Sequence, residues 1–154
     1  MCGSVWKGGA WWSMLTPPQQ GTTMFLGEFQ HSLDSKQRLA IPAEVREQWK
    51  PERHGEVFIA APGQTGSLWL WPEKKFEEHA DRIESGLVTA EEVAWSNRRL
   101  FSRAARVPFD SAGRIRIPDR LLAEYGLTGT VVILGVRDHL ELVTPEQSAK
   151  ELAA

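Results

Sequence analysis

Apolar and polar positions alternate along the chain in patterns that predict short strands and short helices. From Phe25 to Leu33 the odd positions are mainly apolar and the even positions mainly polar, which predicts a half-buried first strand. A shorter strand is predicted at 105–109, where Pro108 favours the edge of a sheet. Four apolar runs predict further strands: 55–61, 68–71, 129–135 and 140–143.

A nine-residue pattern occurs twice in this arrangement. Residues 34–42 read DSKQRLAIP and residues 110–118 read DSAGRIRIP, so that five of the nine positions are identical. A short helix is predicted after the proline that closes each copy, and two strands follow each helix. We therefore predict two tandem repeats of one strand, turn, strand, helix, strand, strand, helix unit.

The repeat predicts where the parts of the chain begin and end. The first repeat is expected at 24–72 and the second at 105–148, with two connecting helices at 73–104. Residues 1–23 carry a single charge and are left out of the fold. Two interpretations of this stretch stay open, a disordered extension or a start codon assigned too early, with Met24 as the true first residue.

Composition and charge narrow the class of protein. Of 154 residues, 42% are hydrophobic and 25% are charged, which is typical of a globular protein. Cys2 is the only cysteine, so no internal disulfide can form and a reducing, cytoplasmic compartment is favoured. The apolar runs are far shorter than the roughly 20 residues of a membrane-spanning helix, so no membrane partner is expected. Net charge is −2, but seven arginines lie between Arg98 and Arg120.

The start of each nine-residue pattern predicts a tight turn. Asp34 and Asp110 can each accept hydrogen bonds from backbone N–H groups two residues on. Gly113 can adopt a positive φ, whereas Gln37 stands at the equivalent position of the first copy. We expect a tight hairpin in each copy, with the aliphatic positions after the turn in the core. The same alternation turns three arginines toward solvent: Arg38, Arg114 and Arg116.

An arginine beside such a turn has two interpretations. Its planar guanidinium suits phosphate oxygens or the O6/N7 edge of guanine. Alternatively, each arginine pairs only with the aspartate of its own turn and locks that turn. The repeat does not decide between them, because a structural lock would be duplicated as faithfully as a binding site.

Three segments resemble the MraZ family, whose two repeats each carry Asp-x-x-x-Arg. They are MFLGEF at 24–29, DSKQRLAIPA at 34–43 and DSAGRIRIP at 110–118. The resemblance covers roughly Met24 to Pro145 and supports Met24 as the natural start. It implies a mainly β fold with helices (α+β), namely a swapped-hairpin β-barrel of AbrB type made from two tandem repeats. The family usually has glycine where this chain has Gln37, and a non-glycine residue there costs on the order of 1 kcal/mol.

The resemblance also implies a function. It implies a DNA-binding transcriptional regulator, expected to repress the bacterial division and cell-wall gene cluster by binding tandem direct repeats of double-stranded DNA. Such a protein would work in the cytoplasm, on the nucleoid, as a ring-like homo-oligomer. The DNA contacts that the resemblance implies fall on Arg38 and Arg114, with Lys36 and Arg116 as neighbours.

Other functions stay open. One is an AbrB-type antitoxin, although such chains usually carry one repeat, and another is a structural oligomer whose arginines only lock turns. The sequence has no phosphate-loop, zinc-site or catalytic motif, so we predict no enzyme activity, no metal and no cofactor. Four further arginines are either cations at a helix C-terminus or a positive surface for DNA or an acidic neighbouring subunit: Arg98, Arg99, Arg103 and Arg106.

Overall fold

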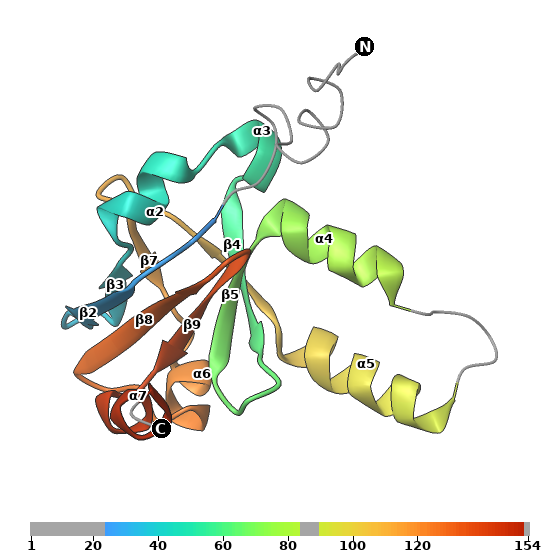
Figure 1. Ribbon diagram of the computed structural model, residues 1–154. Coiled ribbons are helices and arrows are strands. Elements are labelled where there is room, and N and C mark those ends of the chain that lie inside the picture. The colour runs from blue at the N-terminus through green and yellow to red at the C-terminus, as the bar shows by residue number, and fades with distance from the viewer. Residues whose placement is uncertain (1–23, 84–89, 153–154) are drawn as a thin grey trace, which may run out of the picture.

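The computed structural model describes residues 24–83 and 90–152 as a mixed α+β fold, as the sequence predicted (Figure 1). The strands are β2 (Glu28–Ser32), β3 (Arg38–Ala40), β4 (Val57–Pro62), β5 (Leu68–Pro72), β6 (Ala105–Pro108), β7 (Arg114–Arg116), β8 (Thr130–Val136) and β9 (His139–Val143). The helices are α2 (Ala43–Gln48), α3 (Pro51–His54), α4 (Glu73–Arg82), α5 (Glu91–Arg103), α6 (Asp119–Glu124) and α7 (Pro145–Leu152).

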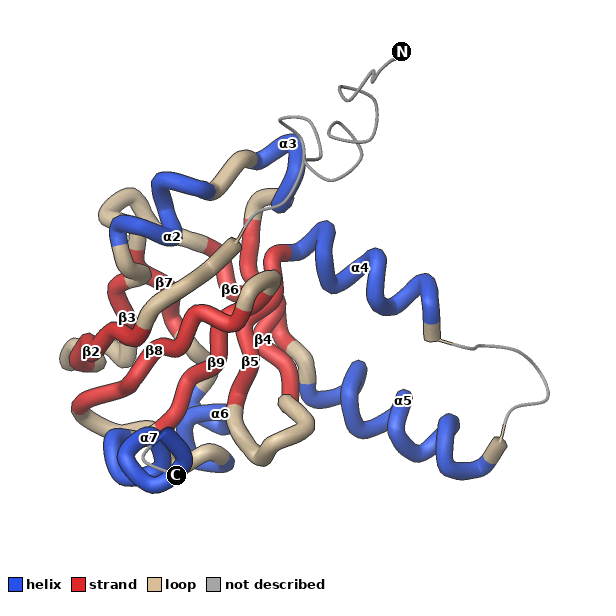
Figure 2. Tube along the Cα trace, in the orientation of Figure 1, coloured by secondary structure: helices blue, strands red, loops and turns tan. Residues whose placement is uncertain are grey.

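The strands form two antiparallel sheets whose pairing crosses between the two halves of the chain (Figure 2). The larger sheet has the order β2-β8-β9-β5-β4-β6, so the first strand of each half pairs with a strand of the other half. The smaller sheet is the ribbon formed by β3 and β7. Among the described strands, no hydrogen bonding joins the edge strands β2 and β6, so the larger sheet does not close into the expected barrel.

The two tight hairpins predicted from the sequence form only in part. In the first, the turn closes because the N–H of Asp34 donates to the carbonyl of Arg38 over 3.0 Å. The strand that follows then pairs with β7 and not with β2. In the second, one bridge between Phe109 and Ile115 joins the strands that flank the turn. The hairpin prediction was wrong in this respect, because alternation indicates which face of a strand is buried and not which strand is its partner.

The core lies under the β3–β7 ribbon and the larger sheet. The aliphatic positions that follow each turn are 0–1% exposed, which confirms their predicted inward face: Leu39, Ile41, Ile115 and Ile117. Trp49 packs against Phe58 and Phe109, with ring centroids 4.9 Å and 5.0 Å away. Helices α2 and α6 begin directly after Pro42 and Pro118, and each buries an apolar side on this core.

Helices α4 and α5 project from the side of the sheet opposite the β3–β7 ribbon (Figure 1). Neither helix contains a buried residue. Phe76 and Phe101 meet edge to face between them, with ring centroids 5.8 Å apart. Helix α4 is also fixed to the sheet by His79, whose ring lies 4.6 Å from that of Trp71.

Truncating the ribbon's inward side chain should destabilise the whole fold. Leu39→Ala removes a side chain that is 0% exposed and is expected to lower the free energy of unfolding by about 2–5 kcal/mol. Leu26→Ala makes the same chemical change at a position 62% exposed and should shift it by about 0.5 kcal/mol or less. Urea unfolding measures both, and similar losses in the two variants would contradict this placement of the core.

Candidate nucleic-acid interface

The turn before β3 is organised by one carboxylate. Oδ1 of Asp34 accepts hydrogen bonds from the backbone N–H of Lys36 (2.8 Å) and of Arg38 (2.9 Å). Oδ2 of Asp34 accepts a hydrogen bond from Nε of the Arg38 side chain over 2.7 Å. The backbone of the turn closes as the N–H of Gln37 donates to the carbonyl of Asp34 over 3.0 Å. One side chain therefore fixes both the turn and the arginine that follows it.

The turn before β7 repeats this geometry with different neighbours. Asp110 accepts the backbone N–H groups of Ala112 (2.8 Å) and Arg114 (2.9 Å) on Oδ1. Its Oδ2 accepts Nε of Arg114 over 2.9 Å. The N–H of Gly113 donates to the carbonyl of Asp110 over 3.1 Å. The two Asp-x-x-x-Arg segments therefore fold into equivalent turns.

Both turns need a left-handed residue before the arginine. Gly113 has a φ of 77°, and Gln37 adopts a φ of 63°, so the first turn keeps the glycine-type shape despite its glutamine. Gly113 is restricted further, because a Cβ there would lie 2.6 Å from Cδ of Arg46. That arginine on α2 donates from Nε to the carbonyl of Ile41 over 3.1 Å. Sequence reasoning missed Arg46, since nothing local indicates that α2 covers the turn of the other repeat.

Hydrogen bonding keeps both turn aspartates ionised. The backbone N–H of Arg38 is the largest influence on Asp34, and together with the Arg38 side chain it outweighs burial and lowers the pKa of that carboxyl from 3.8 to about 2. The backbone N–H of Arg114 likewise leads the influences that lower the pKa of Asp110. Both carboxylates are charged at neutral pH, so each holds its arginine through a charge-assisted hydrogen bond.

Three of the four cations expected to contact DNA lie on the β3–β7 ribbon, and Lys36 lies in the turn before β3. The register places Arg38 opposite Arg116, and Nη1 of Arg114 lies 3.7 Å from Oδ2 of Asp34, which links the two turns. Lys36 and Arg116 are exposed, as alternation predicts for Arg116. Arg38 and Arg114 are less exposed than predicted, with 30% and 33% of their side chains accessible, because each pairs with its own aspartate.

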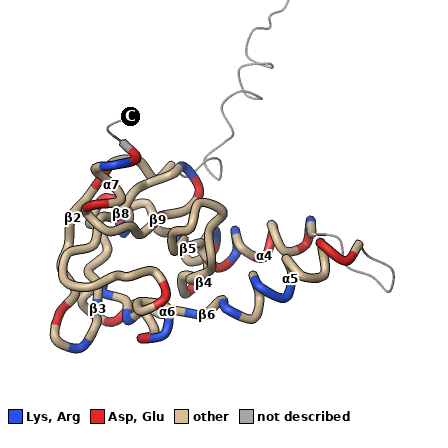
Figure 3. The backbone as a smooth tube through the Cα atoms, turned by 90° about the horizontal axis from the view of Figure 1, so that it is seen from below, with Lys and Arg blue, Asp and Glu red and all other residues tan. Residues whose placement is uncertain are grey.

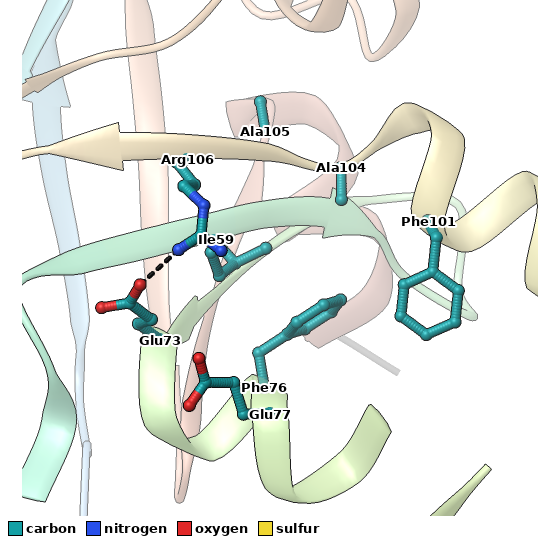
Figure 4. A pocket seen from close by; sticks show the side chains of 8 residues that line it. All are labelled: Ile59, Glu73, Phe76, Glu77, Phe101, Ala104, Ala105 and Arg106. Atoms are coloured by element: carbon teal, nitrogen blue, oxygen red, sulfur yellow. Dashed lines mark hydrogen bonds and ion pairs between the residues drawn. The ribbon is translucent and has the colours of Figure 1, made fainter. Parts of the chain in front are cut away.

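The other predicted arginine group separates in space. Arg106 lies on β6 and forms an ion pair with Glu73 at the start of α4 (Figure 4). Both partners help to line a hollow of about 210 Å³ between α4, α5 and the sheet, together with Phe76 and Phe101. The pair gives Arg106 an acidic partner, whereas Arg98 and Arg99 have no ion-pair partner among the described residues.

The described part of the chain has neither a cluster of metal ligands nor a membrane-spanning helix. Among residues 24–83 and 90–152, no three His, Cys, Asp or Glu side chains come together as metal ligands. Within the same ranges, no helix combines the length and the apolar character that crossing a bilayer requires.

Comparison with known proteins identifies close relatives. A family model described as "MraZ protein, putative antitoxin-like" matches residues 24–97 and 100–148. A protein named "Transcriptional regulator MraZ" from Roseiflexus castenholzii is 36% identical over 131 residues, which cover 85% of this chain and 88% of the relative. A protein of the same name from Thermomicrobium roseum is 33% identical over 128 residues, covering 83% and 87%. A third, from Heliobacterium modesticaldum, is 32% identical over 127 residues, covering 82% and 85%.

Relieving the backbone strain in the first turn should stabilise the protein. Gln37 holds a φ of 63°, which costs an L-residue about 1 kcal/mol or more. Gln37→Gly is expected to raise the free energy of unfolding by about 1 kcal/mol relative to Gln37→Ala, which loses the same side chain but keeps Cβ. Equal stability of the two variants in urea unfolding would show that this turn is not strained.

The lowered pKa values predict acid sensitivity. The unfolded chain protonates Asp34 and Asp110 near their ordinary pKa of 3.8, whereas the folded chain keeps them ionised to lower pH. The unfolded state therefore binds more protons in this window, so the turns contribute fully to stability above the ordinary pKa and less as the pH falls; the contribution of Asp34 is lost as the pH falls through about 2.

Urea unfolding across this pH window measures the effect. The fall in the free energy of unfolding should be smaller in Asp34→Asn/Asp110→Asn than in the parent chain. Asp81→Asn/Asp119→Asn changes two exposed aspartates outside the turns and serves as the control that follows the parent. Parallel pH profiles for all three proteins would contradict the assignment of the low pKa values to the turns.

Proposed function

Because this chain belongs to the MraZ family, whose relatives above are named transcriptional regulators, we propose that it is a sequence-specific DNA-binding transcriptional regulator. The observation that carries the proposal is the placement of three of the expected cations on the β3–β7 ribbon, with Lys36 in the adjoining turn. Two of them, Arg38 and Arg114, come from equivalent turns, which suits two equivalent contacts on one duplex. Lys36 and Arg116 are exposed beside them.

The aspartates position the two arginines for DNA. Each aspartate engages Nε of its arginine, and within the described residues the terminal nitrogens of Arg38 have no hydrogen-bond partner. Those nitrogens can donate to a phosphate or to the O6/N7 edge of guanine. Because the guanidinium is already oriented, less side-chain entropy is lost when DNA binds. The turn lock and the DNA contact are thus two roles of one arginine.

The small size of the ribbon favours an oligomer. The salt slope is the slope of the logarithm of the binding constant against the logarithm of the salt concentration. If two chains contributed four phosphate contacts, this slope would be about −3.6, and affinity would fall roughly two decades between 50 and 200 mM salt. A ring-like homo-oligomer that presents several ribbons to tandem direct repeats would offset this loss through multivalency. The exchange of strands between the halves supports the proposal that each chain forms one swapped-hairpin, AbrB-like unit.

The proposed target follows the family resemblance. The chain would act in the cytoplasm, on the nucleoid, at the division and cell-wall gene cluster, which it would repress. A second candidate function is an antitoxin, favoured by the description of the matching family model. A purely structural oligomer is favoured by the aspartate–arginine locks themselves.

DNA binding by the full chain separates these functions. Fluorescence anisotropy over a salt series should show tight, salt-sensitive binding to DNA from upstream of the chain's own operon and weak binding to a scrambled duplex. Arg116→Ala removes an exposed cation and should make the salt slope less steep by about 0.9 for each chain bound. Arg82→Ala removes an exposed cation on α4, away from the ribbon, and should leave the slope unchanged.

The arginines of the turns give the sharper test. Arg38→Ala/Arg114→Ala is expected to abolish selective binding while the oligomer keeps its size. Retained selectivity in that variant would overturn the site, and equal weak binding of the parent chain to both duplexes would favour the structural or antitoxin function.

A further inference from the structure

Five exposed arginines form a second positive surface, here called the cationic edge: Arg98, Arg99, Arg103, Arg116 and Arg120. In Figure 3, basic positions with some acidic positions between them lie along the lower edge of the view, from the turn before β3, past α6 and β6, to α5. The edge therefore begins at the β3–β7 ribbon, where Arg116 already belongs to the proposed DNA site, and continues onto the projecting helix.

Contacts between α5 and α6 make the edge continuous. Nη1 of Arg120 donates to the carbonyl of Arg103 over 3.4 Å. Nη1 of Arg103 lies 3.0 Å from Oε1 of Glu124. These two contacts hold the C-terminal end of α5 beside α6, which directly follows the ribbon strand β7. Arginines that are distant in sequence thus lie on one side of the molecule.

The helix dipole does not explain the arginines in the middle of α5. A cation interacts with the dipole mainly within the last turn, and Arg103 is the basic residue of that turn. Arg98 and Arg99 lie about one turn further from the end and have no acidic partner among the described residues. Two neighbouring guanidiniums that have no acidic partner are suited to binding an anionic ligand.

The surroundings of Arg98 and Arg99 suit a phosphate backbone. Cζ of Arg98 lies 4.8 Å from the ring centroid of Trp95, an indole that is 59% exposed. The two arginines, Trp95 and two hydroxyl side chains line a shallow hollow on the outer face of α5. Arginine and hydroxyl groups are common donors to phosphate oxygens. Helix α6 carries two acidic side chains: Glu124 is paired with Arg103, and Asp119 is exposed in the first turn.

We propose that the cationic edge is a second DNA-contacting surface, which binds phosphates beyond the bases reached by the β3–β7 ribbon. The inference rests on the proposed function and extends the footprint of each chain along the duplex. The contacts are with the backbone, so the edge adds affinity and salt dependence but no sequence preference. An acidic surface of a neighbouring subunit is the competing occupant, and the experiment below distinguishes it.

The test compares two double variants of the full chain. Arg98→Ala/Arg99→Ala should make the salt slope less steep by about 1.8 for each chain bound, while the ratio of affinities for operator and scrambled DNA stays the same. Arg82→Ala/Lys150→Ala removes two exposed cations from α4 and α7 and should leave the slope unchanged. Light scattering measures the size of each oligomer before DNA is added.

Each outcome has one meaning. A reduced slope with an unchanged oligomer supports the edge as a DNA contact. If the parent chain binds operator selectively and Arg98→Ala/Arg99→Ala has the same salt slope as the parent, this inference is overturned and the proposed function stays intact. A changed oligomer size in Arg98→Ala/Arg99→Ala assigns the edge to a neighbouring subunit and also overturns it. Absence of selective binding by the parent chain overturns the proposed function itself.

Discussion

Each turn carboxylate accepts two backbone N–H groups and one guanidinium N–H, and the rest of the candidate site depends on this arrangement. The backbone bonds of Asp34 and Asp110 shape the turns, and the side-chain bonds orient Arg38 and Arg114. Because the donors lower the pKa of both carboxyls, the bonds are charge-assisted at neutral pH. Strands β3 and β7 follow the two turns directly. Because these strands pair with each other, the two arginines lie on one ribbon.

Local features were predictable from sequence because local chemistry determines them. Asp-Ser-x-x-Arg predicts an Asx-type turn, and alternation after it predicted the burial of Leu39 and Ile115, which are both 0% exposed. Pro108 indicated an edge strand, and β6 does form an edge of the larger sheet. The unusual Gln37 was visible as well, although its φ of 63° was not, since a glutamine tolerates that strain only when the surrounding bonds impose it.

Long-range features were not predictable from one sequence. The pairing of β3 with β7 depends on a register between distant segments, which a period of two cannot specify. The same applies to Arg46 beside Gly113 and to Arg120 beside Arg103, since both contacts join separate elements. The sequence also did not indicate that Arg106 pairs with Glu73 while the arginines of the cationic edge lie together. Only the placement of these residues in the fold separates the two groups.

The central claim is that the two turns act together as one DNA-binding face. Hydrogen-exchange mass spectrometry of the full chain, with and without operator DNA, tests it directly, because the peptides around both turns can be followed in one experiment. We expect operator DNA, but not a scrambled duplex, to slow exchange at residues 34–38 and 110–114 together. Protection of only one turn, or of neither while the operator is bound, would contradict a shared face.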